Sequence, residues 1–150
     1  MMDIREELIR ICREKIDEKV ASLKKSMDGL KEDLENESKS SAGDKYETSR
    51  EMINIEWNKL SQQLVEFEKQ LKTLNRVQHL EPKETVQLGA IVDTGKARYF
   101  ISVPAGEIYL DHQRYYAIGV HSPIAQAMLG KKKGEFFSFR ETSTKINSIA

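Results

Sequence analysis

The chain has 150 residues, and its 24 lysine and arginine residues balance its 24 aspartate and glutamate residues. This neutral charge disfavours a free-standing nucleic-acid-binding protein, which usually carries a basic excess. No apolar run approaches the roughly 18 residues of a membrane-spanning helix, and the acidic, amphipathic N-terminal segment does not fit a signal peptide. The single cysteine, Cys12, excludes an internal disulfide, so we expect a cytoplasmic protein with Cys12 as a buried or half-buried thiol on a helix.

Proline and glycine divide the chain into two halves. Residues 1–81 contain no proline and two glycines, whereas residues 82–150 contain three prolines and six glycines. Because these residues interrupt helices, we predict a helical domain over residues 1–80 and a compact β-rich domain over residues 81–150. Pro82 disfavours helical geometry at Glu81 and marks the joint. The predicted fold class is therefore α+β.

The first half contains two segments whose apolar residues recur at intervals of three and four, the repeat of a coiled coil. Paired in antiparallel order, their apolar residues keep a nearly constant sum of residue numbers over six pairs, for example Leu23 with Leu60. This register predicts an antiparallel helical hairpin of roughly 45 Å, with its tip near residues 38–46 and Trp57 in its core. Such a slender hairpin offers little concave surface for catalysis, so we expect a protein that is not itself an enzyme.

The predicted tip carries two carboxylates, Asp44 and Glu47, which are three residues apart and share one helix face. Two interpretations remain open. Aspartate at the N-cap with glutamate at the third helical position is typical of helix capping. Alternatively, the two groups are oxygen ligands for Mg²⁺, which would bind weakly unless a partner supplied further ligands.

The second half alternates like β-strands near residues 86–92, 97–103, 115–120, 135–140 and 145–149, with a hairpin turn around Gly95. Residues 122–130 predict a short helix that Ser122 caps, with Pro123 in its first turn and Gly130 after its end. These features predict an α+β module with one helix on an antiparallel sheet. The scattered histidines have no zinc-ligand spacing.

Residues 118–135, IGVHSPIAQAMLGKKKGE, resemble the C-terminal signature of the bacterial transcript cleavage factors GreA and GreB. The tip sequence is similar to the G-D-x-x-E of that family, matched by Gly43, Asp44 and Glu47. The order of the parts, a helical hairpin followed by a β-rich domain, also agrees with the family.

The resemblance implies an FKBP-like C-terminal domain that docks on bacterial RNA polymerase, with Ser122, Pro123 and Ile124 as contacts. It also implies that the hairpin enters the secondary channel of the polymerase and brings its tip to the 3′ end of the nascent RNA. Asp44 and Glu47 would then help hold a catalytic Mg²⁺ shared with the polymerase, which cleaves backtracked RNA. The free protein is expected to be a monomer without a tightly bound cofactor and with no membrane association.

Other functions remain as alternatives. Relatives of this architecture also inhibit polymerase, so a secondary-channel regulator that does not stimulate cleavage is the first alternative. The second is a coiled-coil adaptor with an FKBP-like domain, or a weak prolyl isomerase. Cleavage of backtracked RNA, polymerase binding and isomerase activity separate these functions.

Overall fold

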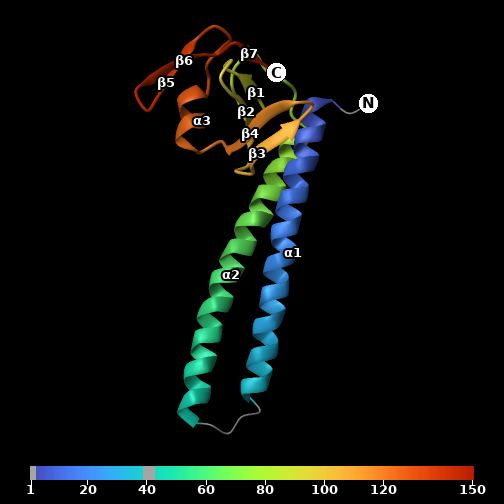
Figure 1. Ribbon diagram of the computed structural model, residues 1–150, viewed down its shortest axis with the longest axis vertical. Coiled ribbons are helices and arrows are strands. Elements are labelled where there is room, and N and C mark those ends of the chain that lie inside the picture. Colours follow the sequence, from blue (N-terminus) through green and yellow to red (C-terminus); the bar gives the residue numbers. More distant parts are fainter. Residues whose placement is uncertain (1–2, 39–42) are drawn as a thin grey trace. The chain divides into compact units, whose positions relative to one another are not determined.

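The computed structural model describes residues 3–38 and 43–150, while the side chains of residues 37–38 and 43–47 lie outside this description. In these described ranges, two long helices, α1 (Ile4–Ser38) and α2 (Gly43–Gln78), precede seven strands and one short helix (Figure 1). The predicted α+β class is confirmed. Contacts group the chain into two compact units: residues 16–69 form one, and residues 1–15 with 70–150 form the other.

The first turn of α1 is closed by a side chain that the pattern of apolar residues does not reveal. The Asp3 carboxylate accepts a hydrogen bond from the Glu6 amide at 2.8 Å, which satisfies one of the free N–H groups at the helix start. One turn later, Arg10 bridges Glu7 and Glu14 at 2.8 Å each. Exposed pairs of this spacing favour helix over coil by a few tenths of a kcal/mol each.

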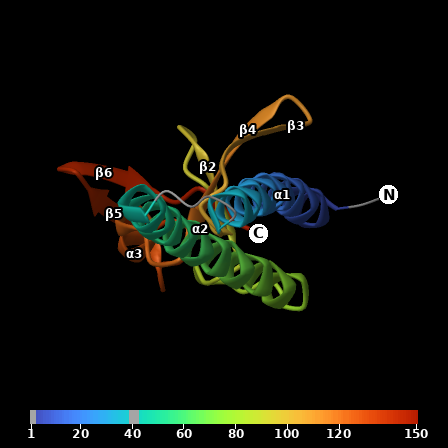
Figure 2. The same ribbon diagram turned by 90° about the horizontal axis from the view of Figure 1, so that it is seen from below.

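Within residues 16–69, the two helices run antiparallel and side by side (Figures 1 and 2). The Lys19 ammonium lies 5.6 Å from the centre of the Phe67 ring. Leu23 and Leu60 are both buried, in agreement with their predicted pairing. Trp57, however, is 36% exposed, so its predicted place in the core is wrong. Two helices cover an apolar stripe from one side only and do not enclose an indole.

The main sheet has five strands in the order β3-β4-β2-β1-β7 (Figure 1). Their bounds are β1 Ile91–Asp93, β2 Arg98–Ser102, β3 Gly106–Leu110, β4 Gln113–Gly119 and β7 Ser148–Ile149. Strands β5 (Phe136–Phe139) and β6 (Thr142–Lys145) form a separate antiparallel hairpin, and helix α3 (Pro123–Met128) lies next to β5.

Several predictions for the strands need correction. The sheet is mixed, because β2 and β4 are parallel. Strand β3, which was not predicted, takes the sheet edge and pairs antiparallel with β4, so that β4 returns beside β2 in the same direction. The strand expected over residues 86–92 is limited to β1, and the one expected over residues 145–149 is split between β6 and β7. The turn at Gly95 is confirmed, with a φ of 81°.

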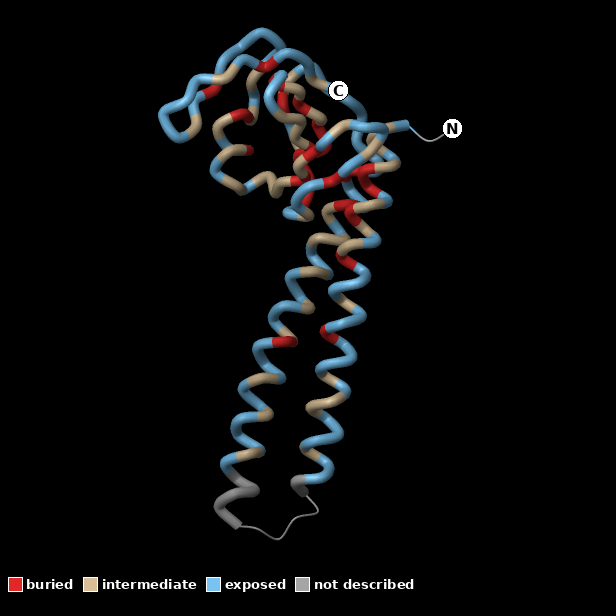
Figure 3. The backbone as a smooth tube through the Cα atoms, viewed as in Figure 1, coloured by how far each residue is buried: buried red, intermediate tan, exposed pale blue. Residues whose placement is uncertain are grey.

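Buried residues concentrate in the β-rich unit and in the helix ends that belong to it (Figure 3). On one face of the sheet, Val92 and Ile101 pack with Ala125 and Met128 of α3 and with Phe137 of β5. The helix ends contribute further fully buried side chains, namely Leu8, Cys12, Leu74 and Val77. None of the described helices is apolar over a stretch long enough to cross a membrane.

Candidate functional sites

Helix α3 begins as its sequence predicts. The Ser122 hydroxyl accepts a hydrogen bond from the Ala125 amide at 3.3 Å, and Pro123 occupies the first helical turn. Gly130 follows the helix with a φ of 81°, a conformation that favours glycine. The segment that carries the resemblance to the transcript cleavage factors is therefore a well-capped helix on the edge of the apolar core.

The three predicted contact residues of α3 differ in what they present. The Ser122 hydroxyl is engaged in the cap, and Ile124 is half-buried against the core. Pro123 is exposed. Of the three, Pro123 therefore offers the largest side-chain surface to a partner.

The lysine turn after α3 is fixed to the rest of the domain. Val86 and Gly130 are joined by a backbone hydrogen bond of 2.9 Å, and the Val86 amide donates to the Lys131 carbonyl at 2.8 Å. The Glu135 carboxylate accepts a hydrogen bond from the Lys132 amide, also at 2.8 Å. Lys132 and Lys133 are exposed on this ordered turn.

The two tip carboxylates, Asp44 and Glu47, have side chains outside the described residues. Their backbone belongs to the start of α2, which begins at Gly43. Asp44 is thus inside the first turn and does not precede it, which weakens the interpretation of Asp44 as an N-cap. A spacing of three in a helix keeps both residues on one face. Two carboxylates match the oxygen ligands that Mg²⁺ prefers but leave most of its six positions to other groups.

A cluster of tyrosines around Arg114 was not predicted from the sequence. The Arg114 guanidinium pairs with the Glu107 carboxylate at 3.0 Å and donates a hydrogen bond to the Tyr109 hydroxyl at 3.2 Å. These contacts raise the pKa of Arg114. Tyr116 and Tyr99 continue the cluster on neighbouring strands, with ring centres 6.1 Å apart. Tyr109 is 63% exposed.

The two-residue turn Asp111–His112 was the signal in the sequence that could have revealed this cluster, because it joins β3 to β4. In an antiparallel ladder, directly opposed residues share a face, and β3 and β4 oppose Tyr109 to Arg114. Exposed tyrosine and arginine together are typical of protein interfaces.

The one cysteine is a structural residue. Cys12 is fully buried, and this burial raises the pKa of its thiol from 9.0 to about 11, although nearby Lys15 opposes the rise. The nearby Ser102 hydroxyl also opposes the rise in the pKa of Cys12, although its oxygen makes no hydrogen bond to any described atom. The thiolate is the reactive form of cysteine, and burial together with the raised pKa keeps its fraction small, so Cys12 fits a structural role.

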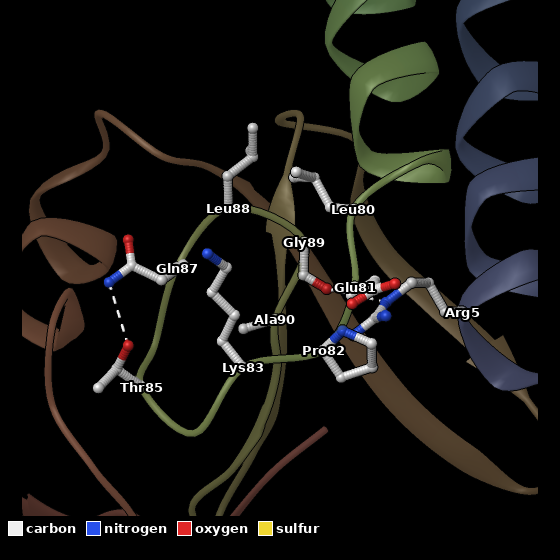
Figure 4. Close-up of a pocket in the computed structure, with 10 residues that line it drawn as sticks. All are labelled: Arg5, Leu80, Glu81, Pro82, Lys83, Thr85, Gln87, Leu88, Gly89 and Ala90. Carbon is white, nitrogen blue, oxygen red and sulfur yellow. Dashed lines mark hydrogen bonds between the residues drawn. The ribbon is translucent and has the colours of Figure 1, made fainter.

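The β-rich unit contains a small pocket between Arg5 and the loop of residues 80–90 (Figure 4). Arg5 Nε donates a hydrogen bond to the Gly89 carbonyl at 3.0 Å and ties the start of α1 to this loop. The pocket has a volume of about 10 Å³, which accommodates about one water molecule and excludes a substrate. A larger hollow of about 530 Å³ lies along a single face of α2 and has no opposite wall.

Among the residues whose side chains the structure describes, 3–36 and 48–150, no three histidine, cysteine, aspartate or glutamate side chains gather as metal ligands. Comparison with known protein families and with curated proteins gives no match for this chain. The observations that bear on function are therefore the capped helix α3, the carboxylates of the α2 start and the order of helices and sheet.

Proposed function

We propose that this protein is an accessory factor of bacterial RNA polymerase, a transcript cleavage factor that acts in the cytoplasm as a monomer. The observation that carries the proposal is the segment 118–135. Its resemblance to the transcript cleavage factors coincides with a capped helix that exposes Pro123 and with a fixed turn that exposes two lysines. The helical pair that precedes an α+β domain supports the same function.

In this proposal the chain contributes two carboxylates and no active site of its own. The β-rich domain binds the polymerase, and the helical pair brings Asp44 and Glu47 into its secondary channel, to the 3′ end of backtracked RNA. Magnesium shared with the polymerase supplies the activation of water for hydrolysis. The role of the two carboxylates is to complete an oxygen-ligand set whose other members belong to the polymerase.

The decisive experiment is cleavage of RNA in purified backtracked polymerase complexes. We expect the native chain to shorten the RNA, and D44N or E47Q to lower the cleavage rate at least a hundredfold while polymerase binding is unchanged. A double D44N/E47Q variant that cleaves normally would remove the carboxylates from the mechanism. Binding of the native chain without RNA shortening would instead identify a regulator that does not stimulate cleavage.

A second variant tests the docking surface. Glutamate is favourable in the first turn of a helix, so P123E preserves α3 while it adds a charge to the proposed contact. We expect P123E to weaken polymerase binding at least tenfold. K96Q, in the turn between β1 and β2, is the control that lowers the charge by the same single unit, and it should bind normally. Equal binding of both variants would contradict docking through α3.

A further inference from the structure

The edges of the two sheets are protected to different degrees. At one edge of the main sheet, the Lys15 ammonium donates hydrogen bonds to the carbonyl of Glu107 in β3, at 2.7 Å, and to the carbonyl of Ala105 just before β3, at 3.4 Å. The other edge is β7, which has only two residues. Strand β6 has four residues, and no further strand pairs with it in the described part of the chain.

The pairing of β5 with β6 shows which backbone groups of β6 are free. Next to this ladder, the Ile146 amide donates to the Glu135 carbonyl at 2.9 Å. Hydrogen-bonded and non-hydrogen-bonded pairs alternate in an antiparallel ladder. Because the Ile146 backbone is hydrogen-bonded to the β5 side, the backbones of Thr144 and Thr142, two and four residues earlier, also form hydrogen bonds with β5. The N–H and C=O groups of Ser143 and Lys145, which alternate with them, point away from β5. The free edge therefore has the spacing that a further strand requires.

The sequence of this hairpin and of the turn before it is basic and partly apolar. Residues 131–145 contain five cationic and two acidic side chains, a net charge of +3 in a chain whose net charge is zero. Phe136 is 58% exposed and lies opposite Lys145 in the ladder. The Arg140 guanidinium lies 5.0 Å from the centre of the Phe139 ring at the end of the hairpin. A second copy of β6 would bring two basic edges together, which disfavours self-pairing.

We propose that the free edge of β6 binds an extended acidic segment of another protein, which adds a strand beside Ser143 and Lys145. Backbone hydrogen bonds to these two residues provide the alignment, and acidic side chains at alternate positions of the partner complement the positive charge of residues 131–145. Single-stranded nucleic acid also carries negative charge, but it does not use the strand-spaced N–H and C=O groups. This docking site is independent of the proposed contact at Pro123.

The test uses the full-length protein and a fluorescent peptide of roughly eight residues in which glutamate and valine alternate. We expect saturable binding by fluorescence anisotropy. S143P removes an N–H that faces away from β5, so it should weaken binding at least tenfold, while S143A keeps this N–H and should bind like the native chain. The same peptide should also lose binding when N-methyl groups replace the N–H donors along the edge that would pair with β6.

Amide signals provide a measurement that does not depend on the folding of S143P. In the native protein, saturation with the acidic peptide should slow hydrogen exchange at the Ser143 and Lys145 amides, with little change at Thr142 and Thr144. No saturable binding up to about 1 mM peptide, or exchange that is unchanged at Ser143, would overturn the proposal. So would tighter binding of a single-stranded oligonucleotide that S143P leaves unaffected, or dimerisation through this edge.

Discussion

Ser102 and Thr94 show how differently two buried hydroxyl groups contribute to the stability of one domain. The Thr94 hydroxyl donates to the Ala97 carbonyl at 2.9 Å and accepts from the Ala97 amide at 3.1 Å, so both of its functions are satisfied within the turn. Ser102 is 3% exposed, and its hydroxyl oxygen has no hydrogen-bond partner among the described atoms. A buried hydroxyl without a partner carries its desolvation cost uncompensated.

We therefore expect S102A to raise the free energy of unfolding by about 1 kcal/mol. The matched change T94V removes a satisfied hydroxyl from an equally buried position and should lower the free energy of unfolding by about 1 to 2 kcal/mol. Guanidinium denaturation of the two variants measures both values. A loss of stability in S102A comparable to that in T94V would mean that the Ser102 hydroxyl makes a favourable interaction in solution.

At the scale of elements, the two tight hairpins differ in how well their residues suit their turns. Asp111–His112 joins β3 to β4, and Arg140–Glu141 joins β5 to β6, and all four residues have positive φ. The second residue has a φ of 62° at His112 and 65° at Glu141. Histidine is enriched in this left-handed region, whereas glutamate is not, so the β5–β6 turn carries more backbone strain.

Glycine removes this strain because it has no Cβ. We expect E141G to stabilise the β5–β6 hairpin by about 1 kcal/mol, seen as slower amide exchange in β6. H112G, the same change at the equivalent position of the other turn, should stabilise β3–β4 by less. If E141G stabilised its hairpin no more than H112G stabilised β3–β4, residue preference in the left-handed region would not distinguish the two turns.

The elements that could be predicted from sequence are those set by neighbours in the chain. The heptad-like repeat predicts both helices, and Ser122 with Pro123 predicts the start of α3. The parallel pairing of β2 with β4 could not be predicted, because it depends on β3 taking the sheet edge. The cluster around Arg114 was missed because β3 was not predicted, although the Asp111–His112 turn indicates the β3–β4 hairpin. The role of Asp44 and Glu47 stays a prediction, since it depends on a partner.

At the scale of the whole molecule, the apolar core is distributed unevenly between the two compact units. Among the described residues of the 16–69 unit, only Ile16, Leu23 and Leu60 are buried apolar side chains, and the other unit contains all the remaining ones. Stability follows apolar burial, and regions with few buried contacts open at lower free energy than the core. The helical pair of residues 16–69 should therefore unfold before the β-rich unit.

The single tryptophan makes this order measurable, because Trp57 belongs to the 16–69 unit and reports on it alone. We expect its fluorescence to change at a lower guanidinium concentration than the amide protection of β2 and β4. L23A should shift only the fluorescence midpoint. I101V, which removes a methylene from the buried core of the β-rich unit, should lower its stability by about 1 kcal/mol and shift the protection midpoint. Coincident transitions in all three proteins would show a single cooperative unit, in which burial at one end of the helices stabilises their full length.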